Sequence, residues 1–438
     1  MLGIFKPGRI VSYAFLTVVF TCIFGVATSL PPQKISQKDP LYGYGSDSEV
    51  YWDLAGNLAH GRGFVHSPGF DFSYLHKTSE FTQGTQRLPG YPLALSLIRA
   101  LDLNAAPNSW LAWMFNLSLV FLNSYFVIGI LVILYPNTKT VFFWLVALFP
   151  PFLIYANGIN SDFFAATLIS AAVYFSLASS RWRYLSVCFG AFAVFTRGNV
   201  LFFLVPFWLM LAIYYRRQRR DIKPAVFGLA AIALIFIGWS FRNQALSDRF
   251  VFAPFTGLQL RQNYIYKIYE DQRPAGEERY WRWRAPEYLK QRFEDLNSQT
   301  GSLYKAESQL DKELVGDTIQ LVLERPAAVV FTYGRDIVQM LTNEYFLFNL
   351  GRSVNSPWLW GGIWPVAIIF YLLPGAWLLL LAARFFIRKF FAPLSIIVFS
   401  AAVYIFLTAA VLGDFARYLL PVGFAIIIAV KSAFQKYD

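Results

Sequence analysis

Long apolar segments dominate the chain, and short, mostly charged segments separate them. A helix needs roughly 20 consecutive, mostly apolar residues to cross the hydrocarbon core of a bilayer. The segments that reach or approach this length are 10–30, 109–134, 141–157, 162–180, 184–196, 199–215, 224–241, 358–383, 391–411 and 418–431. The pattern therefore predicts an all-α integral membrane protein with about ten transmembrane helices.

The first apolar segment begins like a secretory signal sequence, because Lys6 and Arg9 precede it. Its apolar run is longer than a usual signal core, and further predicted spans follow it. We therefore interpret it as a membrane anchor that is retained.

The basic residues indicate which side of the membrane each connection faces. If the N-terminus is cytoplasmic, the inner connections hold Lys6, Arg9, Lys139, Arg181, Arg183, Arg216, Arg217, Arg219, Arg220, Lys223, Arg384, Arg388, Lys389, Lys431 and Lys436. Against them stand two acidic residues, Asp221 and Asp438. Cytoplasmic loops carry an excess of Lys and Arg. The distribution thus predicts that both termini are cytoplasmic.

Two long segments, 31–107 and 242–357, lie on the outer side in this topology. Neither contains a low-complexity linker or an internal repeat, so we predict one domain, residues 1–438, whose outer loops fold onto its helices. Helices are expected within these loops at 48–60, 89–103, 286–298, 303–324 and 326–346. The helices at 89–103 and 326–346 are short or carry charges, and we place both at the outer interface.

Composition and cysteine usage narrow the class of protein. Hydrophobic residues make up 56% of the chain and charged residues 15%, which excludes a disordered chain and an ordinary soluble enzyme. Cys22 and Cys188 both lie in predicted spans, so no disulfide is expected in the outer loops, and a bacterial inner membrane fits this usage. The net charge of +12 arises from the inner connections, so a nucleic-acid partner is not expected.

Two acidic residues, Asp47 and Glu49, stand at the start of the helix expected at 48–60. One interpretation is structural, because Ser46 and Glu49 have the spacing of a capping box. The other is catalytic: a carboxylate at the interface reaches the proton of an acceptor hydroxyl, with Asp47 as the base and Glu49 as an auxiliary carboxylate or metal ligand. Spacing alone leaves both open.

The outer segment Arg87-Leu88-Pro89-Gly90-Tyr91-Pro92 follows in the same loop. Pro89 is well placed to start a helix, and Arg87 then faces the interface just before it. A turn with a solvated arginine is the alternative interpretation.

At this point the chain resembles the GT-C membrane glycosyltransferases, in particular the bacterial relatives of protein O-mannosyltransferases and of the aminoarabinose transferase that modifies lipid A. The resemblance covers roughly residues 5–435 and lies in the order of short motifs. These are the acidic residue after the first span, the Arg-x-Pro-Gly-Tyr-Pro segment, Tyr155 to Asp162, Phe195 to Asn199, Trp239 to Asn243, Glu313 to Pro326, and Asp414 to Pro421. Asp162 departs from the family, which often has Glu there.

The resemblance implies a function on the outer face. Members of the family move a sugar from a polyprenyl-phosphate carrier to a hydroxyl of a lipid, glycan or protein acceptor, within the surrounding membrane lipids. It implies that Asp47 is the base of an inverting transfer, with Glu49 and Asp162 as further catalytic acids. It also implies that substrate is bound by Arg87, Tyr91, Arg197, Arg242, Arg417 and Tyr418. Snorkelling to lipid headgroups or a structural salt bridge is the alternative for each arginine.

A metal site and a sugar-binding surface are both weaker hypotheses. His60, His66, His76 and Glu80 share the first outer loop, but their spacing matches no compact zinc pattern, so no metal site is predicted. The resemblance does not decide whether a divalent cation takes part. In the second loop, Tyr264, Tyr266, Tyr269, Tyr280, Trp281 and Trp283 are expected either to pack at the interface or to stack on a sugar.

Two other classes of protein compete with the glycosyltransferase. A transporter or lipid flippase needs polar groups near the bilayer midplane, whereas here the ionisable residues gather near one face. An O-antigen polymerase or ligase would share the late outer loop and would not need the acidic loop after the first span.

Overall fold

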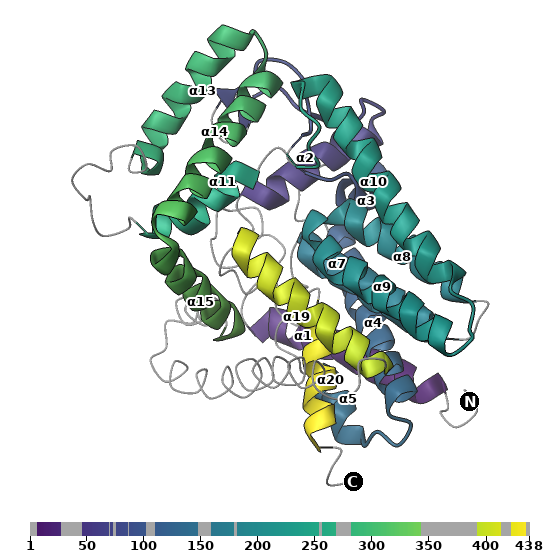
Figure 1. Cartoon of the computed structure of the whole chain (residues 1–438). Helices are drawn as coiled ribbons and strands as arrows, with labels where there is room; N and C mark the ends of the chain where they lie inside the picture. Colours follow the sequence, from purple (N-terminus) through teal and green to yellow (C-terminus); the bar gives the residue numbers. More distant parts are fainter. Residues whose placement is uncertain are drawn as a thin grey trace.

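The computed structural model describes residues 7–27, 46–69, 71–72, 76–85, 87–101, 110–147, 159–178, 182–253, 256–268, 282–342, 392–412 and 422–434. These residues are mostly helical, and their helices form a bundle flanked by a smaller group of helices (Figure 1). The bundle helices are α1 (Pro7–Ala27), α4 (Trp110–Leu134), α5 (Thr140–Ala147), α7 (Ser161–Leu177), α8 (Arg183–Thr196), η4 (Gly198–Val200), α9 (Leu201–Arg217), α10 (Lys223–Ser247), α19 (Pro393–Leu412) and α20 (Gly423–Phe434).

The remaining elements belong to the two predicted outer loops. The first loop contains α2 (Ser46–Ala59), β1 (Val65–His66), β2 (Asp71–Phe72), β3 (His76–Lys77), β4 (Thr82–Gln83) and α3 (Gly90–Leu101). The second contains α11 (Thr256–Leu260), η5 (Arg261–Tyr266), η6 (Arg282–Arg284), α13 (Pro286–Thr300), α14 (Leu303–Glu324) and α15 (Pro326–Thr342). All five expected loop helices are therefore present. The antiparallel pairs β1–β4 and β2–β3 are additions that the apolar pattern did not predict.

Within the described residues, three helical segments are long and apolar enough to cross a membrane: Leu111–Leu134, Gly198–Arg217 and Lys223–Ser247. Five shorter apolar helical segments accompany them: Ile10–Ile23, Gly90–Leu101, Ser161–Leu177, Arg183–Thr196 and Pro393–Thr408. These findings indicate a membrane protein, whereas ten spans stay a prediction. The span expected at 358–383 lies outside the described residues, as do parts of those expected at 141–157 and 418–431.

Contacts between helix ends show that α7 runs antiparallel to α8 and parallel to α9. Asp162 at the start of α7 pairs with Arg197 at the end of α8, whereas Tyr215 at the end of α9 donates to the Ser176 carbonyl near the end of α7. Following the predicted topology, we call the end with Asp162 and Arg197 the outer end and the end with Tyr215 the inner end. The basic connection between α9 and α10 lies at the inner end.

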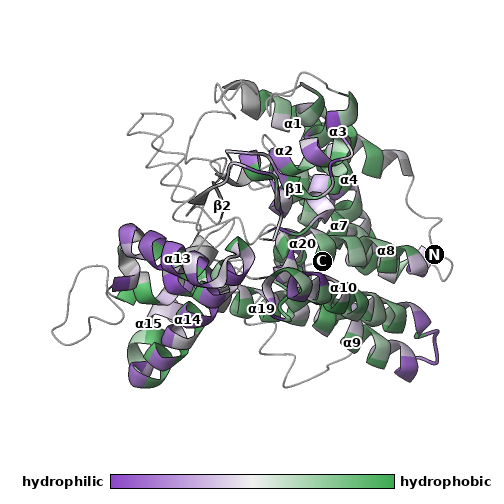
Figure 2. Ribbon diagram, turned by 90° about the horizontal axis from the view of Figure 1, so that it is seen from above, coloured by the Kyte–Doolittle hydropathy of each residue, from purple (hydrophilic) through white to green (hydrophobic). Residues whose placement is uncertain are grey.

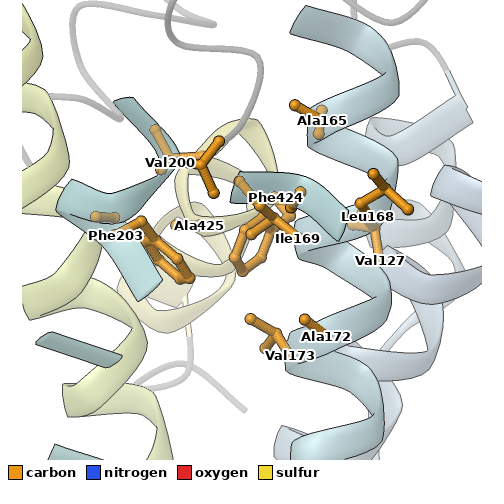
Figure 3. Packing of buried hydrophobic residues seen from close by; sticks show 14 of the residues in the cluster. Val127, Ala165, Leu168, Ile169, Ala172, Val173, Val200, Phe203, Phe424 and Ala425 are labelled. Atoms are coloured by element: carbon orange, nitrogen blue, oxygen red, sulfur yellow. The ribbon is translucent and has the colours of Figure 1, made fainter. Parts of the chain in front are cut away.

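Helix α7 occupies the centre of the bundle because its sequence is apolar on every side, and such helices are buried. Figure 3 shows its side chains Leu168, Ile169 and Val173 packed among residues of other bundle helices. The surrounding side chains include Val127 of α4 and Phe424 of α20, and both are fully or almost fully buried.

Two glycines admit the largest buried side chain of the bundle. Trp208 on α9 is fully buried, and its indole ring lies against Gly190 of α8 and Gly228 of α10. A Cβ atom on Gly228 would come within 2.6 Å of the indole ring. The absence of a Cβ atom therefore lets α8, α9 and α10 pack closely around one tryptophan.

The sides of the bundle carry exposed apolar side chains, as contact with lipid requires. On α10, Phe227, Leu234 and Phe241 are exposed, and on α3, Leu97 and Leu101 are exposed. Contiguous exposed apolar surface of this kind marks contact with a membrane or a partner. The exposed apolar faces of α10 and α3 are therefore consistent with a bundle that lies in lipid.

Helices α11, η5, η6, α13 and α14 share a hydrophobic core of their own, which includes Trp283, Phe293 and Leu310. Figure 2 shows that α13 and α14 are largely hydrophilic, in contrast to α8, α9 and α10. Arg292 and Glu313 join α13 to α14 with two hydrogen bonds of 3.0 and 2.6 Å. This polar group of helices is therefore a folded unit with its own core and not a linker.

Candidate functional site

The start of α7 carries a buried carboxylate. Asn160 is the N-cap residue of the helix, and its side chain accepts a hydrogen bond of 2.7 Å from the backbone N–H of Asp162. Asparagine is favoured at this position because it satisfies an N–H group that has no partner inside the helix. The cap fixes the first turn, and Asp162 in that turn is only 1% exposed.

Asp162 forms an ion pair with Arg197, whose Nε lies 3.0 Å from the carboxylate oxygen Oδ1. Arg197 is the C-cap residue of α8 and has an extended backbone (φ −145°, ψ 123°), which ends the helix there. Its Nη1 also donates to the Ser161 hydroxyl at 2.9 Å. With side chains that are 14% and 1% exposed, the two charges are buried against each other.

Two tyrosines continue this network toward α2 and α3. Ser161 donates to the Tyr51 hydroxyl at 2.9 Å, and the Tyr51 ring meets the Tyr91 ring edge-on at 5.2 Å. The guanidinium carbon of Arg87 lies 5.8 Å from the centre of the Tyr51 ring, within cation–π range. Burial raises the pKa of Tyr91 well above its ordinary value, so its hydroxyl stays protonated.

We call Tyr51, Arg87, Tyr91, Ser161, Asp162 and Arg197 the outer cluster. The sequence analysis assigned four of them to the site: Arg87, Tyr91, Asp162 and Arg197. It missed Tyr51 and Ser161. Tyr51 lies within the helix expected at 48–60, and the one signal in its favour is that it lies two residues after Glu49.

Gly90 explains the close approach between α3 and α8. A Cβ atom on Gly90 would lie 2.7 Å from the carbonyl carbon and oxygen of Phe195, which are backbone atoms that cannot move aside cheaply. Glycine at this position lets the start of α3 touch the end of α8. The Pro-Gly-Tyr segment therefore places Tyr91 beside the residues around Arg197.

The predicted catalytic segment begins α2 next to this cluster. The Ser48 hydroxyl donates to the carbonyl of Ile159 at 3.0 Å, so the first turn of α2 lies against the residue before Asn160. Asp47 is in that turn, although its side chain lies outside the described residues. Glu49 is exposed. The helix begins at Ser46, and the capping-box hypothesis stays untested because the Ser46 side chain is likewise not described.

Arg242 lies apart from the outer cluster. It donates to the Gln83 side chain at 3.2 Å and stacks on Trp239 with 4.5 Å between the guanidinium carbon and the ring centre. It therefore joins the end of α10 to the first outer loop. Trp239 contacts Phe195 edge-on at 5.8 Å, and Phe195 lies two residues before Arg197 of the cluster. Arg417 and Tyr418 lie outside the described residues.

The structure pairs one histidine of the first loop with Asp53 on α2. His66 Nδ1 lies 3.2 Å from an Asp53 oxygen, and the Ser67 hydroxyl and backbone N–H donate to the same carboxylate at 2.6 and 3.0 Å. Among the described residues, no group of three or more His, Cys, Asp and Glu side chains has metal-binding geometry. Asp53 was not singled out from the sequence, since only the fold brings it to residues 66 and 67.

The aromatic residues of the second loop that the structure describes are packed inside it. Tyr264 and Trp283 are 7% and 1% exposed and belong to the core of the outer helices. The Trp283 indole N–H donates to Asp317 at 2.6 Å. Both rings are thus structural. The side chains of Tyr266, Tyr269, Tyr280 and Trp281 lie outside the described residues.

The ionised carboxylate of Asp53 is expected to stabilise the folded protein near neutral pH and to lose this effect in acid. Burial alone would raise its pKa, but the hydrogen bonds from His66 and Ser67 outweigh burial and hold the pKa below its ordinary value. A lowered pKa stabilises the fold above the ordinary value, about 3.9, and this contribution is lost as the pH falls through the folded value. The advantage of wild type over Asp53→Asn in thermal midpoint is therefore expected to be constant from pH 7 to 5 and to shrink below pH 4.

The matched control for this prediction is Glu80→Gln, which neutralises an exposed carboxylate of the same loop. Its thermal midpoint should follow that of wild type at every pH. An Asp53→Asn variant with the same pH profile as wild type would contradict the role assigned to this carboxylate.

Comparison with models of known protein families found no match, and comparisons with curated proteins and with solved structures found none either. The case for a function therefore rests on the residues and on the geometry of the outer cluster.

Proposed function

We propose that the protein is a GT-C type glycosyltransferase, which moves a sugar from a polyprenyl-phosphate donor to an acceptor hydroxyl on the outer face of a bacterial inner membrane. One observation carries the proposal. Arg87, Tyr91, Asp162 and Arg197 come from distant parts of the sequence and meet at one end of the bundle, beside the first turn of α2 that holds Asp47.

The reaction is an inverting displacement at the anomeric carbon. Asp47 takes the proton of the acceptor hydroxyl, whose oxygen attacks the anomeric carbon from the face opposite the phosphate. The bond between the anomeric carbon and the phosphate oxygen breaks, and polyprenyl phosphate leaves with both electrons. The products are the glycosylated acceptor and the lipid phosphate, and the proton is on the carboxyl of Asp47.

Negative charge grows on the leaving phosphate, so the transition state needs nearby cations. Arg87 is proposed to stabilise this phosphate, because arginine binds phosphate oxygens through two parallel N–H groups. Arg197 lies at the same end of the bundle, where its Nε is paired with Asp162. This ion pair favours a positioning role for Asp162, and the catalytic role expected for it stays a prediction.

The placement of the charges argues for this function over transport. Asp162 lies in the first turn of α7 and Arg197 follows the last residue of α8, so both stand at helix ends. A transport pathway would place such groups near the middle of the spans. Chemistry at the interface needs them where they are.

Sugar transfer by the purified protein in detergent tests the proposal, because no membrane then separates two compartments. The full chain is incubated with polyprenyl-phosphate hexoses and pentoses and with an extract of envelope glycolipids, and products are identified by mass spectrometry. We expect loss of the sugar from one donor and a matching mass gain on an acceptor. The proposal would be contradicted by two results together. The purified, folded protein would consume none of these donors, and deleting the gene would leave the glycans of the cells unchanged.

A further inference from the structure

A cavity of about 400 Å³ lies at the inner end of the bundle, where α4, α7 and α9 end and α19 begins. Its lining includes the apolar side chains of Ile133, Leu177 and Leu394 and the polar side chains of Tyr135 and Arg220. Leu177 and Asp162 stand at opposite ends of α7, which at 1.5 Å per residue separates them by roughly 20 Å. The cavity is therefore distinct from the outer cluster and plays no part in the proposed reaction.

Tyr135 forms part of the wall of this cavity, and its hydroxyl is buried within the wall. The residue is only 6% exposed, and within the described part of the chain its hydroxyl has no hydrogen-bond partner. The Tyr135 hydroxyl is therefore a buried group inside the cavity wall and is not open to a ligand in the cavity.

Positive charge surrounds the same cavity. Arg220 belongs to the wall and is exposed at its rim. Lys431 of α20 is 3% exposed, and its Nζ lies 5.7 Å from the centre of the Tyr135 ring. Arg183 lies over the neighbouring Tyr215 ring at 4.8 Å. Among the described residues, the lining contains no carboxylate, and Asp221, which follows Arg220 in the chain, accepts hydrogen bonds from Tyr184 and the Lys223 backbone.

From these observations we infer that the cavity binds the headgroup of an anionic phospholipid from the inner leaflet. Arg220 binds the phosphate oxygens, and Lys431 adds attraction from behind the Tyr135 ring. The acyl chains leave along the apolar wall of Ile133, Leu177 and Leu394 into the bilayer. Basic cavities between helices on the cytoplasmic side are suited to such headgroups because they combine cations with an apolar wall.

Lipid binding by the purified full chain tests this inference. Native mass spectrometry in a neutral detergent measures the bound fraction of phosphatidylglycerol and of phosphatidylcholine, and the shift in thermal midpoint is recorded for each lipid and for inorganic phosphate. We expect phosphatidylglycerol to bind and to raise the midpoint, and phosphatidylcholine and inorganic phosphate to have little effect.

Three variants locate the site. Arg220→Gln is expected to weaken phosphatidylglycerol binding about tenfold, the usual effect of losing one charge-assisted hydrogen bond. Tyr135→Phe removes a hydroxyl that does not face the ligand and should retain binding, whereas Leu177→Trp, which fills the cavity, should abolish it. The control Arg216→Gln removes an exposed positive charge from the same end of α9 outside the lining, and it should retain binding within about twofold.

Three outcomes would overturn the inference. Equal binding of phosphatidylcholine would show that the charge of the headgroup is not recognised. An equal loss in Arg220→Gln and Arg216→Gln would show diffuse attraction by the basic connection and no built site. An equal shift with inorganic phosphate would show an anion site that does not need a lipid.

Discussion

Replacing Arg197 with glutamine is expected to destabilise the bundle by about 3–5 kcal/mol, the usual cost of removing one partner of a buried ion pair. Asp162 is 1% exposed and its Oδ1 lies 3.0 Å from Arg197 Nε, so the carboxylate that remains cannot reach water without opening the start of α7. The variant also loses the hydrogen bond from Arg197 to Ser161. Thermal unfolding in detergent, followed by tryptophan fluorescence, measures the effect.

A double-mutant cycle separates the ion pair from other effects of the substitution. Asp162→Asn is expected to cost less than Arg197→Gln, because Arg197 is 14% exposed and keeps access to solvent. The double variant Asp162→Asn/Arg197→Gln should be more stable than Arg197→Gln alone, since it no longer buries the Asp162 carboxylate without the charge of Arg197. Arg216→Gln, which alters an exposed arginine, serves as the control. Strictly additive effects in the cycle would rule out the coupling.

Asp47→Asn is expected to reduce sugar transfer by about 100-fold or more, because a positioned general base contributes a factor of about 10²–10⁴. The substitution keeps the size of the side chain and removes its ability to accept a proton. The rate of product formation by purified protein measures this loss, and cells that carry the variant should accumulate the lipid-linked sugar.

Glu49→Gln is the comparison variant, since Glu49 is exposed, lies two residues further along the same helix and is expected to act as an auxiliary carboxylate. It should lose less activity than Asp47→Asn, and both variants should unfold at the temperature of the wild type. Full activity in Asp47→Asn would remove Asp47 from the mechanism. A large loss in Glu49→Gln with an unchanged thermal midpoint would instead assign the base to that residue.

The helical elements were largely predictable because they depend on local pattern. The expected loop helices at 286–298 and 303–324 are Pro286–Thr300 and Leu303–Glu324 in the structure. The two ends of the first of these helices are also local in origin, because Pro286 begins it and Gly301, in the left-handed conformation, ends it. The short strand pairs were not predictable, since a two-residue strand has no detectable alternation.

The sequence by itself determined which segments are apolar helices, which connections are basic, and that Arg87, Tyr91, Asp162 and Arg197 belong to turns expected on one side. Only the tertiary structure decided that Asp162 pairs with Arg197, that Arg242 stays apart, and that Ser161 and Tyr51 link α7 to α2. The physical reason is the range of each interaction. Apolar periodicity and charge bias act within one segment or against the membrane, whereas these contacts depend on side-chain packing between segments as far apart as 159 residues.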